Sequence, residues 1–184
     1  MSVSQLWSER LQLRPMRPED AQAMYTFASD PEIAAMGMWE PLKSLEACRA
    51  DIKDMLATEA QGIDWTWAVV LRQEQLMIGM CQLLNYRVQH ARTELGYMYN
   101  RGYWGKGYAT EAASLVVDFA FTRLHAHRIE ATVLATNLAS IHLLKKIGMQ
   151  YEGCKREARR EKTGFVDLHI YGMLSHEASN MLLR

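Results

Sequence analysis

The sequence predicts an α/β fold in which helices lie on the faces of a mixed β-sheet. Three observations support this prediction. The chain has 184 residues of which 49% are hydrophobic, enough for one sizeable core. Short strand-like runs recur at seven places, and amphipathic segments with helix-capping residues separate them. The resulting order, β-α-α-α-β-β-β-α-β-α-β-β, combines hairpins with crossover connections in a single predicted domain, residues 1–184.

The first four elements are a strand and three helices. Residues 10–16 alternate between apolar and polar side chains, which predicts a strand. A helix over residues 18–28 follows, with proline in its first turn and acidic residues at its positive end. Asp30 begins a second, short helix, and Ser44 is placed to cap a third.

Three strands occupy the middle of the chain. Residues 66–71 and 77–84 are predicted to pair through the polar turn at residues 72–75. A further strand spans residues 93–99 and contains Gly96, which suggests a bulge or a close approach of another backbone.

The second half begins with a helix that runs from a glycine-rich turn to about Leu124. A strand over residues 129–134 follows. Asn137 then caps a short helix over residues 138–147, which Gly148 ends.

The last two strands are predicted at about residues 150–158 and 166–174, around the turn Lys162-Thr163-Gly164. The net basic segment at residues 155–162 is interpreted as a solvated hairpin; attraction for an acidic peptide or RNA is the alternative.

Composition limits the classes of function. A formal net charge of zero argues against nucleic-acid or membrane binding as the main activity. The chain has no signal-peptide pattern and no apolar span, so a cytoplasmic location is expected. Cys48, Cys81 and Cys154 form no C-x-x-C pair, which predicts small buried hydrophobes rather than a metal site. His125 and His127 lack acidic or cysteine partners nearby, so no metal is expected.

The segment from Trp104 to Ala112 is the strongest local signal. It runs from a predicted strand through Gly105 and Gly107 into a helix, an arrangement that presents free backbone N–H groups to an anion. It matches neither a Walker A loop nor a complete dinucleotide fingerprint. A phosphorylated cofactor and an ordinary strand-to-helix turn are both compatible with the loop alone.

Several segments together resemble one family. They are Ser29-Asp30-Pro31-Glu32-Ile33, Ile78-Gly79, Glu94-Leu95-Gly96-Tyr97, the Trp104–Ala112 segment, Arg128-Ile129-Glu130-Ala131, and Asn137-Leu138-Ala139-Ser140 with Lys146-Ile147-Gly148-Met149. Their order over about residues 9–175 is similar to that of the GNAT N-acetyltransferases, in particular the ribosomal-protein alanine and serine N-acetyltransferases.

The resemblance implies the GNAT acyl-CoA N-acyltransferase fold, with about seven strands and a splay between the fourth and fifth. It also implies acetyl-CoA as co-substrate and no metal. The implied cofactor-binding residues are Tyr97, Met98, Tyr99, Trp104, Gly105, Lys106, Gly107, Tyr108, Ala109, Thr110, Asn137, Ser140 and Lys146. Trp104 stands where the family has glutamine or arginine, so that side-chain contact at the pyrophosphate is expected either to be lost or to be replaced by Arg101 or Lys106.

The implied reaction is direct attack of an amine on the thioester, which needs a donor for the departing sulfur. Many family members have a tyrosine where this chain has Leu144. Ser140 is the substitute, and the alternative is a helix-start hydroxyl bonded to the backbone. Asn137 is a helix cap, a cofactor contact, or both.

Glu94 and Glu130 are the candidate bases. The favoured interpretation of each one alone is a strand-end charge paired with an arginine. A water chain with no single base is the third option, because an α-amino group is already substantially unprotonated at neutral pH.

The acceptor is predicted to be a primary amine, first of all the N-terminus of a protein such as a ribosomal protein. A polyamine, amino acid or antibiotic amine is the alternative, and an acyl-CoA-binding module without turnover is the alternative from another class. Trp39 is a candidate acceptor contact, His142 is placed on the surface, and a homodimer is compatible with the resemblance.

Overall fold

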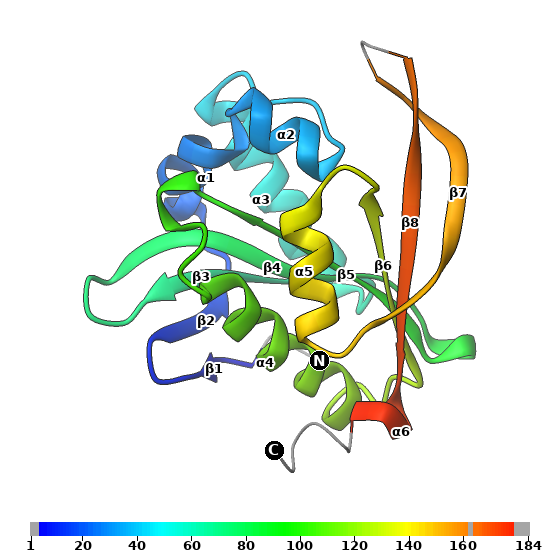
Figure 1. The fold of residues 1–184 in the computed structure, drawn as a ribbon. Coiled ribbons are helices and arrows are strands. Elements are labelled where there is room, and N and C mark those ends of the chain that lie inside the picture. Colours follow the sequence, from blue (N-terminus) through cyan, green and yellow to red (C-terminus); the bar gives the residue numbers. More distant parts are fainter. Residues whose placement is uncertain (1–3, 162–163, 179–184) are drawn as a thin grey trace.

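A computed structural model of the chain describes residues 4–161 and 164–178. Within them, eight strands form one sheet in the order β1-β2-β3-β4-β5-β6-β8-β7, with helices around it (Figure 1). The strands are β1 (Leu6–Trp7), β2 (Leu11–Pro15), β3 (Trp65–Leu71), β4 (Leu76–Arg87), β5 (Arg92–Tyr99), β6 (Arg128–Leu134), β7 (Gln150–Glu161) and β8 (Gly164–Leu174). The helices are α1 (Ala21–Ala28), α2 (Pro31–Gly37), α3 (Leu45–Ala60), α4 (Tyr108–Thr122), α5 (Leu138–Lys146) and α6 (Ser175–Ala178).

The predicted α/β fold with a mixed sheet is confirmed. Neighbouring strands are antiparallel except β5 and β6, which are parallel. The expected number of about seven strands omitted β1, which pairs Leu6 with Leu13 and Trp7 with Gln12. A strand of two residues is too short to show alternation in the sequence.

The helices cover both faces of the sheet. Side chains of α1, α2 and α3 pack with Ala68, Val70 and Met80 in one core cluster. Side chains of α4 and α5 pack in a second cluster against the opposite face, around Trp67 and Ile129. The sheet therefore carries a core on each side.

Local sequence signals set where the helices begin. The Asp30 carboxylate accepts the Glu32 N–H at 2.8 Å at the start of α2, and the Ser44 hydroxyl accepts the Ala47 N–H at 3.1 Å at the start of α3. Asn137 caps α5, and Gly148 follows its end with φ of 86°. All of these predicted caps are confirmed.

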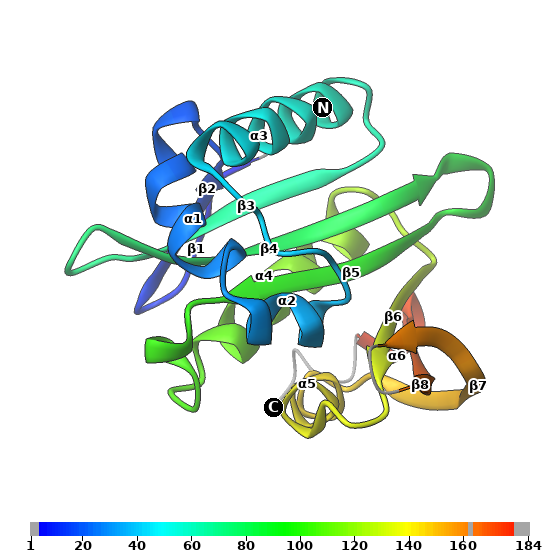
Figure 2. The same ribbon diagram turned by 90° about the horizontal axis from the view of Figure 1, so that it is seen from above.

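The predicted splay lies between β5 and β6. Their pairing runs only from Arg92 opposite Arg128 to Glu94 opposite Glu130, whereas β5 stays paired with β4 as far as Tyr99. Figure 2 shows β3, β4 and β5 lengthwise and β6, β7 and β8 nearly end-on. The last residue of β5 that pairs with β6 is Glu94, so the gap has already opened at Gly96.

Gly96 itself is not a bulge. It pairs with Gln82 in regular register, and the register shift between β4 and β5 lies between Leu84 and Arg87. Gly96 instead marks a close approach, because a Cβ there would come within 3.2 Å of the Leu84 side chain.

The β7–β8 hairpin is longer than predicted and extends to one side of the molecule (Figure 1). Its outer part pairs Arg159 with Val166 and Glu161 with Gly164. These residues are largely polar and show no apolar period that would reveal a strand. In the predicted turn, Lys162 and Thr163 lie outside the described residues.

Two of the three cysteines follow the prediction. Cys48 and Cys81 are buried, but Cys154 is exposed on β7, so its expected burial is wrong. Its strand lies at the edge of the sheet, where one side has no neighbour. No helix in the described part of the chain is both long and apolar enough to cross a membrane.

Candidate active site

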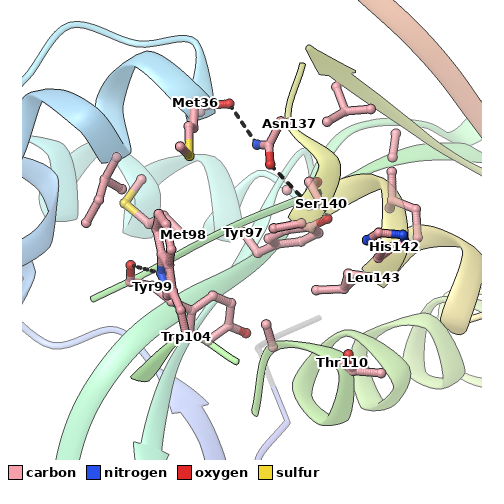
Figure 3. A pocket seen from close by; sticks show the side chains of 18 of the residues that line it. Met36, Tyr97, Met98, Tyr99, Trp104, Thr110, Asn137, Ser140, His142 and Leu143 are labelled. Atoms are coloured by element: carbon pink, nitrogen blue, oxygen red, sulfur yellow. Dashed lines mark hydrogen bonds between the residues drawn. The ribbon is translucent and has the colours of Figure 1, made fainter. Parts of the chain in front are cut away.

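A cavity of about 480 Å³ opens where β5 and β6 diverge. Its walls come from the end of α2, from β5 and β6, from the glycine loop before α4, and from the first turns of α5 (Figure 3). Of the predicted cofactor-binding residues, the cavity is lined by Tyr97, Met98, Tyr99, Trp104, Gly105, Gly107, Tyr108, Ala109, Thr110, Asn137, Ser140 and Lys146. Lys106, which lies between two of these glycines, is not part of the lining.

The backbone of β5 faces this cavity with free polar groups. The Asn100 N–H donates to Ile78 O at 2.9 Å, so the backbone of residue 100 points toward β4. Alternation along an antiparallel strand then turns the N–H groups of Tyr97 and Tyr99 away from β4, into the gap. β6 has already diverged there, so these N–H groups have no strand partner in the described part of the chain and can bond an extended ligand.

The glycine loop ends in an uncapped helix start. Gly105 and Gly107 have φ of 74° and 81°, a region that favours glycine, and a Cβ at Gly105 would meet nothing within 4 Å. No side chain of the described residues caps α4. The Glu111 N–H donates to Gly107 O at 3.0 Å, so the three preceding N–H groups have no partner inside the helix. This arrangement fits a phosphate group.

Arg10 and Glu111 hold the loop against β2. The Arg10 guanidinium donates to Glu111 at 2.5 Å and 2.7 Å and to Lys106 O at 3.1 Å, and Ser8 Oγ donates to Glu111 at 2.5 Å. Burial raises the pKa of the Glu111 carboxyl, but the hydrogen bonds from Ser8 and Arg10 outweigh it, so that the pKa lies below its usual value. The loop is thus anchored through a charged carboxylate.

Glu111→Gln is expected to raise the KM for acetyl-CoA about threefold, since the weakened anchor leaves the loop less ordered. Because this pKa is lowered on folding, the ion pair contributes its full stabilisation at pH values above the ordinary carboxyl pKa of 4.5. That contribution is lost as the pH falls through the pKa of Glu111 in the folded protein. The gap in melting temperature between the wild type and the variant should therefore shrink below that pH. Asp118→Asn, at an exposed position of α4, is the control, and an equal KM in both variants would contradict the anchor.

The position of Trp104 explains its departure from the family pattern. The Trp104 indole N–H donates to Tyr99 O at 2.8 Å, so the ring ties the loop to the end of β5 (Figure 3). Arg101 pairs with Glu32 at 2.6 Å and does not line the cavity. Lys106 Nζ lies 5.1 Å from the centre of the Tyr103 ring. Of the two expected substitutes, Arg101 is thus engaged with α2, whereas the Lys106 ammonium lies over an aromatic face.

Ser140 and Asn137 lie together at the start of α5. Asn137 Oδ1 accepts the Ser140 N–H at 3.1 Å, and Asn137 Nδ2 donates to Met36 O at 3.4 Å (Figure 3). The Ser140 hydroxyl bonds the Tyr97 hydroxyl at 2.6 Å, so its partner is a side chain across the cleft and not the backbone. Burial raises the pKa of Tyr97 far above its usual range. Leu144 is buried beside them and carries no polar group.

The two candidate bases do not line the cavity. Glu130 accepts from Arg128 at 2.7 Å and lies 3.7 Å from Arg92, which agrees with the paired strand-end alternative. Glu94 lies where β5 and β6 are still paired, before the gap opens. For either glutamate to act as the base, its carboxylate would have to move into the cavity. Proton removal through a chain of water molecules needs no such movement.

Two residues line the cavity that the sequence did not mark as part of it. His142 is exposed, as expected, but it also lines the cavity, as does Thr132. Alternation and helical period do not report which side chains border a gap between strands.

A second cavity of about 340 Å³ shares Trp39, Tyr97 and Met98 with the first. Its lining also includes Glu40, Asp51 and Gln82. Burial raises the pKa of the Asp51 carboxyl, and the charge of Asp54 raises it further. Trp39 thus stands between the two cavities, consistent with its prediction as an acceptor contact, and its indole nitrogen is buried without a partner among the described residues.

No group of three or more potential metal ligands occurs among residues 4–161 and 164–178. His125 is exposed at the turn after α4 and His127 is exposed just before β6.

Comparisons with known proteins agree with this geometry. Residues 10–150 match the family model of an acetyltransferase (GNAT) domain. An uncharacterized N-acetyltransferase, p20, from Bacillus licheniformis is 32% identical over 94% of this chain and 97% of its own length. The crystal structure of an acetyltransferase of the GNAT family from Bacillus anthracis is 26% identical with a TM-score of 0.83, covering 95% of this chain and all of that one.

Proteins with different named acceptors are also similar. Spermidine N(1)-acetyltransferase of Escherichia coli strain K12 is 28% identical over 78% of this chain and 74% of its own length. The ribosomal-protein-S5-alanine acetyltransferase of Vibrio fischeri and the spermidine N-acetyltransferase of Vibrio cholerae, solved with CoA and spermine, superpose with TM-scores of 0.82 and 0.85. They cover 94% of this chain and 97% and 100% of their own, and at 21% identity each shares the fold alone.

Proposed function

Because the chain belongs to the GNAT family of acetyltransferases, we propose that it transfers the acetyl group of acetyl-CoA to a primary amine by direct attack. The acceptor proposed first is the N-terminal α-amino group of a protein, such as a ribosomal protein. Residues 1–184 are proposed to act as one N-acetyltransferase domain. A cytoplasmic location and a homodimer stay predictions.

The observation that best supports acetyl-CoA as the acetyl donor is the cleft between β5 and β6. It joins free backbone N–H groups at Tyr97 and Tyr99 to the uncapped start of α4, so one elongated site offers amide partners along its length and an anion site at its end. Acetyl-CoA has this distribution of groups, an amide-containing arm with a pyrophosphate. Gly105 and Gly107 are proposed to hold the pyrophosphate and β5 to hold the arm.

The chemical step needs few groups from the protein. A neutral amine attacks the carbonyl carbon of the thioester, and negative charge develops on the carbonyl oxygen. The Tyr97 and Tyr99 N–H groups are the proposed hydrogen-bond donors to that oxygen. Ser140 is proposed to donate to the departing sulfur, and Asn137 to fix the first turn of α5 that carries it. A dedicated base is not required, because the amine loses its proton to water before attack.

A protein N-terminus is supported by the sequence resemblance and by the open rim of the cleft. Met36 and Gly37 at the end of α2 are both exposed and line the cavity, so an extended chain end has a way in. The reacting nitrogen is then the first atom to reach the cleft.

A small cationic amine is the second candidate, and the second cavity favours it. Asp51 and Glu40 place two carboxylates beside Trp39, where they would attract a positively charged group at a distance from the reacting amine. The similarity to an Escherichia coli spermidine N(1)-acetyltransferase supports the same candidate.

The test is CoA release from acetyl-CoA with a panel of N-terminal peptides, polyamines and amino acids. Turnover on peptides that depends on their first residue supports the first candidate, and equally negligible rates on all peptides contradict it. Binding of acetyl-CoA without CoA release on any acceptor would instead indicate the non-catalytic acyl-CoA-binding module.

A substitution at Asp51 tests the second candidate, a polyamine acceptor. If a polyamine is the acceptor, Asp51→Asn should raise its KM about tenfold, because one desolvated attraction is lost, while the KM for acetyl-CoA stays unchanged. Glu46→Gln removes a carboxylate at an exposed position of the same helix and is the control. Equal KM values in the two variants would remove Asp51 from the acceptor site.

A further inference from the structure

Two hydroxyl groups meet across the cleft. Tyr97 reaches from β5 and Ser140 stands in the first turn of α5, 43 residues further along the chain, and their oxygens lie 2.6 Å apart (Figure 3). Both side chains line the cavity in which the thioester is proposed to lie. The contact therefore bridges the two walls of the cleft.

The direction of this hydrogen bond follows from the chemistry of the two groups. Either hydroxyl could donate on geometry alone, and we assign the Tyr97 hydroxyl as donor and Ser140 Oγ as acceptor because a phenol is a stronger acid than an aliphatic alcohol. The Ser140 N–H is already bonded to Asn137, which fixes the backbone on which the hydroxyl turns. With one of its two lone pairs accepting from Tyr97 in this assignment, Ser140 keeps its own proton available to donate within the cleft.

We propose that Tyr97 and Ser140 form one hydrogen-bonded donor unit, in which Tyr97 is a positioning residue that aims the Ser140 hydroxyl at the sulfur leaving from acetyl-CoA. The inference rests on the proposed function. It assigns to the Tyr97 side chain a part beyond the backbone contact predicted for that residue.

The step that this unit assists balances without a further reactant. The amine nitrogen forms a bond to the carbonyl carbon, the C–S bond breaks, and its electron pair goes to sulfur. The Ser140 hydroxyl donates a hydrogen bond to that sulfur, and the proton that the nitrogen gives up to water returns to the sulfur as the thiol forms. Neither hydroxyl loses its own proton in this scheme.

The surroundings of Tyr97 support a donor that stays neutral. Burial raises the pKa of its hydroxyl, and the buried Cys81 thiol on β4, whose own pKa burial raises to about 12, adds to the effect. Tyr99 on β5 is likewise buried, and His142 on α5 lines the same cavity. A neutral phenol keeps its hydrogen bond to Ser140 over the whole working pH range.

This unit also gives a reason why leucine is acceptable at position 144. In many family members a tyrosine hydroxyl reaches the thioester from position 144 on α5. In this chain the Ser140 hydroxyl is paired with the Tyr97 hydroxyl from β5 on the opposite wall, so no hydroxyl is needed at position 144. Leu144 is 1% exposed and packs in the core cluster with α4 and α5, so a polar group there would lose this packing.

The test is a double-variant cycle with Tyr97→Phe and Ser140→Ala. Tyr97→Phe should lower kcat about tenfold and leave the KM for acetyl-CoA nearly unchanged, because the ring and the backbone stay in place. In the Ser140→Ala background the same change should alter kcat less than about twofold, since both act through one donor. A merely structural role of Tyr97 would give additive losses, and additivity overturns the proposal.

Tyr86→Phe is the matched control. It also removes a tyrosine hydroxyl, which donates to Leu124 O at a distance of 2.9 Å. This hydroxyl is not in the cleft, so kcat should stay unchanged. A wild-type kcat that declines near pH 10 would show that Tyr97 gives up its proton, which also overturns the proposal and can be measured even if Tyr97→Phe fails to fold. Absence of CoA release by the wild type would contradict the proposed function, whereas an active wild type with an equally active Tyr97→Phe contradicts this inference alone.

Discussion

Gly105→Asp is expected to raise the KM for acetyl-CoA by about a hundredfold. The new carboxylate would stand at the loop proposed for the pyrophosphate, and it would both repel the phosphates and offer an acceptor to the free N–H groups of α4. Aspartate tolerates a positive φ better than most residues, so the backbone strain stays small. Titration of the folded variant with acetyl-CoA, together with initial rates, measures the effect.

Gly62→Asp is the control for that substitution. Gly62 has φ of 70°, close to the 74° of Gly105, and a Cβ at either position meets nothing within 4 Å. The two variants therefore carry a similar strain and the same added charge, but only one of them at the cleft. If both variants bind acetyl-CoA like the wild type, the glycine loop is not the phosphate site.

Ser140→Ala should lower kcat by about a hundredfold while the affinity for acetyl-CoA is nearly retained. The substitution removes the one hydroxyl proposed to contact the departing sulfur, an interaction that strengthens only as charge develops there. Its loss therefore appears in kcat and not in binding. Single-turnover rates with saturating acetyl-CoA separate the chemical step from product release.

Ser114→Ala provides the comparison. Ser114 is exposed on α4, and its hydroxyl donates to Thr110 O at 2.9 Å within the helix. The substitution has the same chemistry and no contact with the cleft, so kcat should equal that of the wild type. Wild-type turnover in Ser140→Ala would remove the serine from the mechanism and leave water to donate the hydrogen bond to the departing sulfur.

The parts of the fold that the sequence predicted are those encoded locally. Asn137 caps a helix whose first N–H groups lie within three residues of it, and Gly105 and Gly107 form a turn that is complete within one short segment. Such features depend on neighbours in the chain, so the pattern alone identifies them. The splay was expected only from the resemblance, because nothing within β5 reveals which strand will lie beside it.

The missed parts depend on residues that are distant in the sequence. Tyr97 and Ser140 belong to a strand and a helix that no local pattern connects, and Asp51 faces a cavity whose other wall is β4 and β5. Glu130 illustrates the converse, because the sequence offered it as a candidate base, whereas one arginine of β5 and one of β6 lie beside it. Side chains that meet across a gap are fixed by tertiary packing, which the sequence does not display.

The three residue pairs that join β5 to β6 have a consequence for stability. They connect two parts of the sheet that come from separate stretches of the chain, residues 6–99 and 128–174. A ligand bound in the gap as proposed would bond to the N–H groups of β5 and to the start of α4, and would extend the first part of the sheet like an added strand. Because it binds the folded chain and not the unfolded one, a free concentration of one hundred times the dissociation constant adds about 2.7 kcal/mol to the free energy of unfolding. The cellular supply of acetyl-CoA would thereby set not only how fast this chain turns over substrate but also how long it survives.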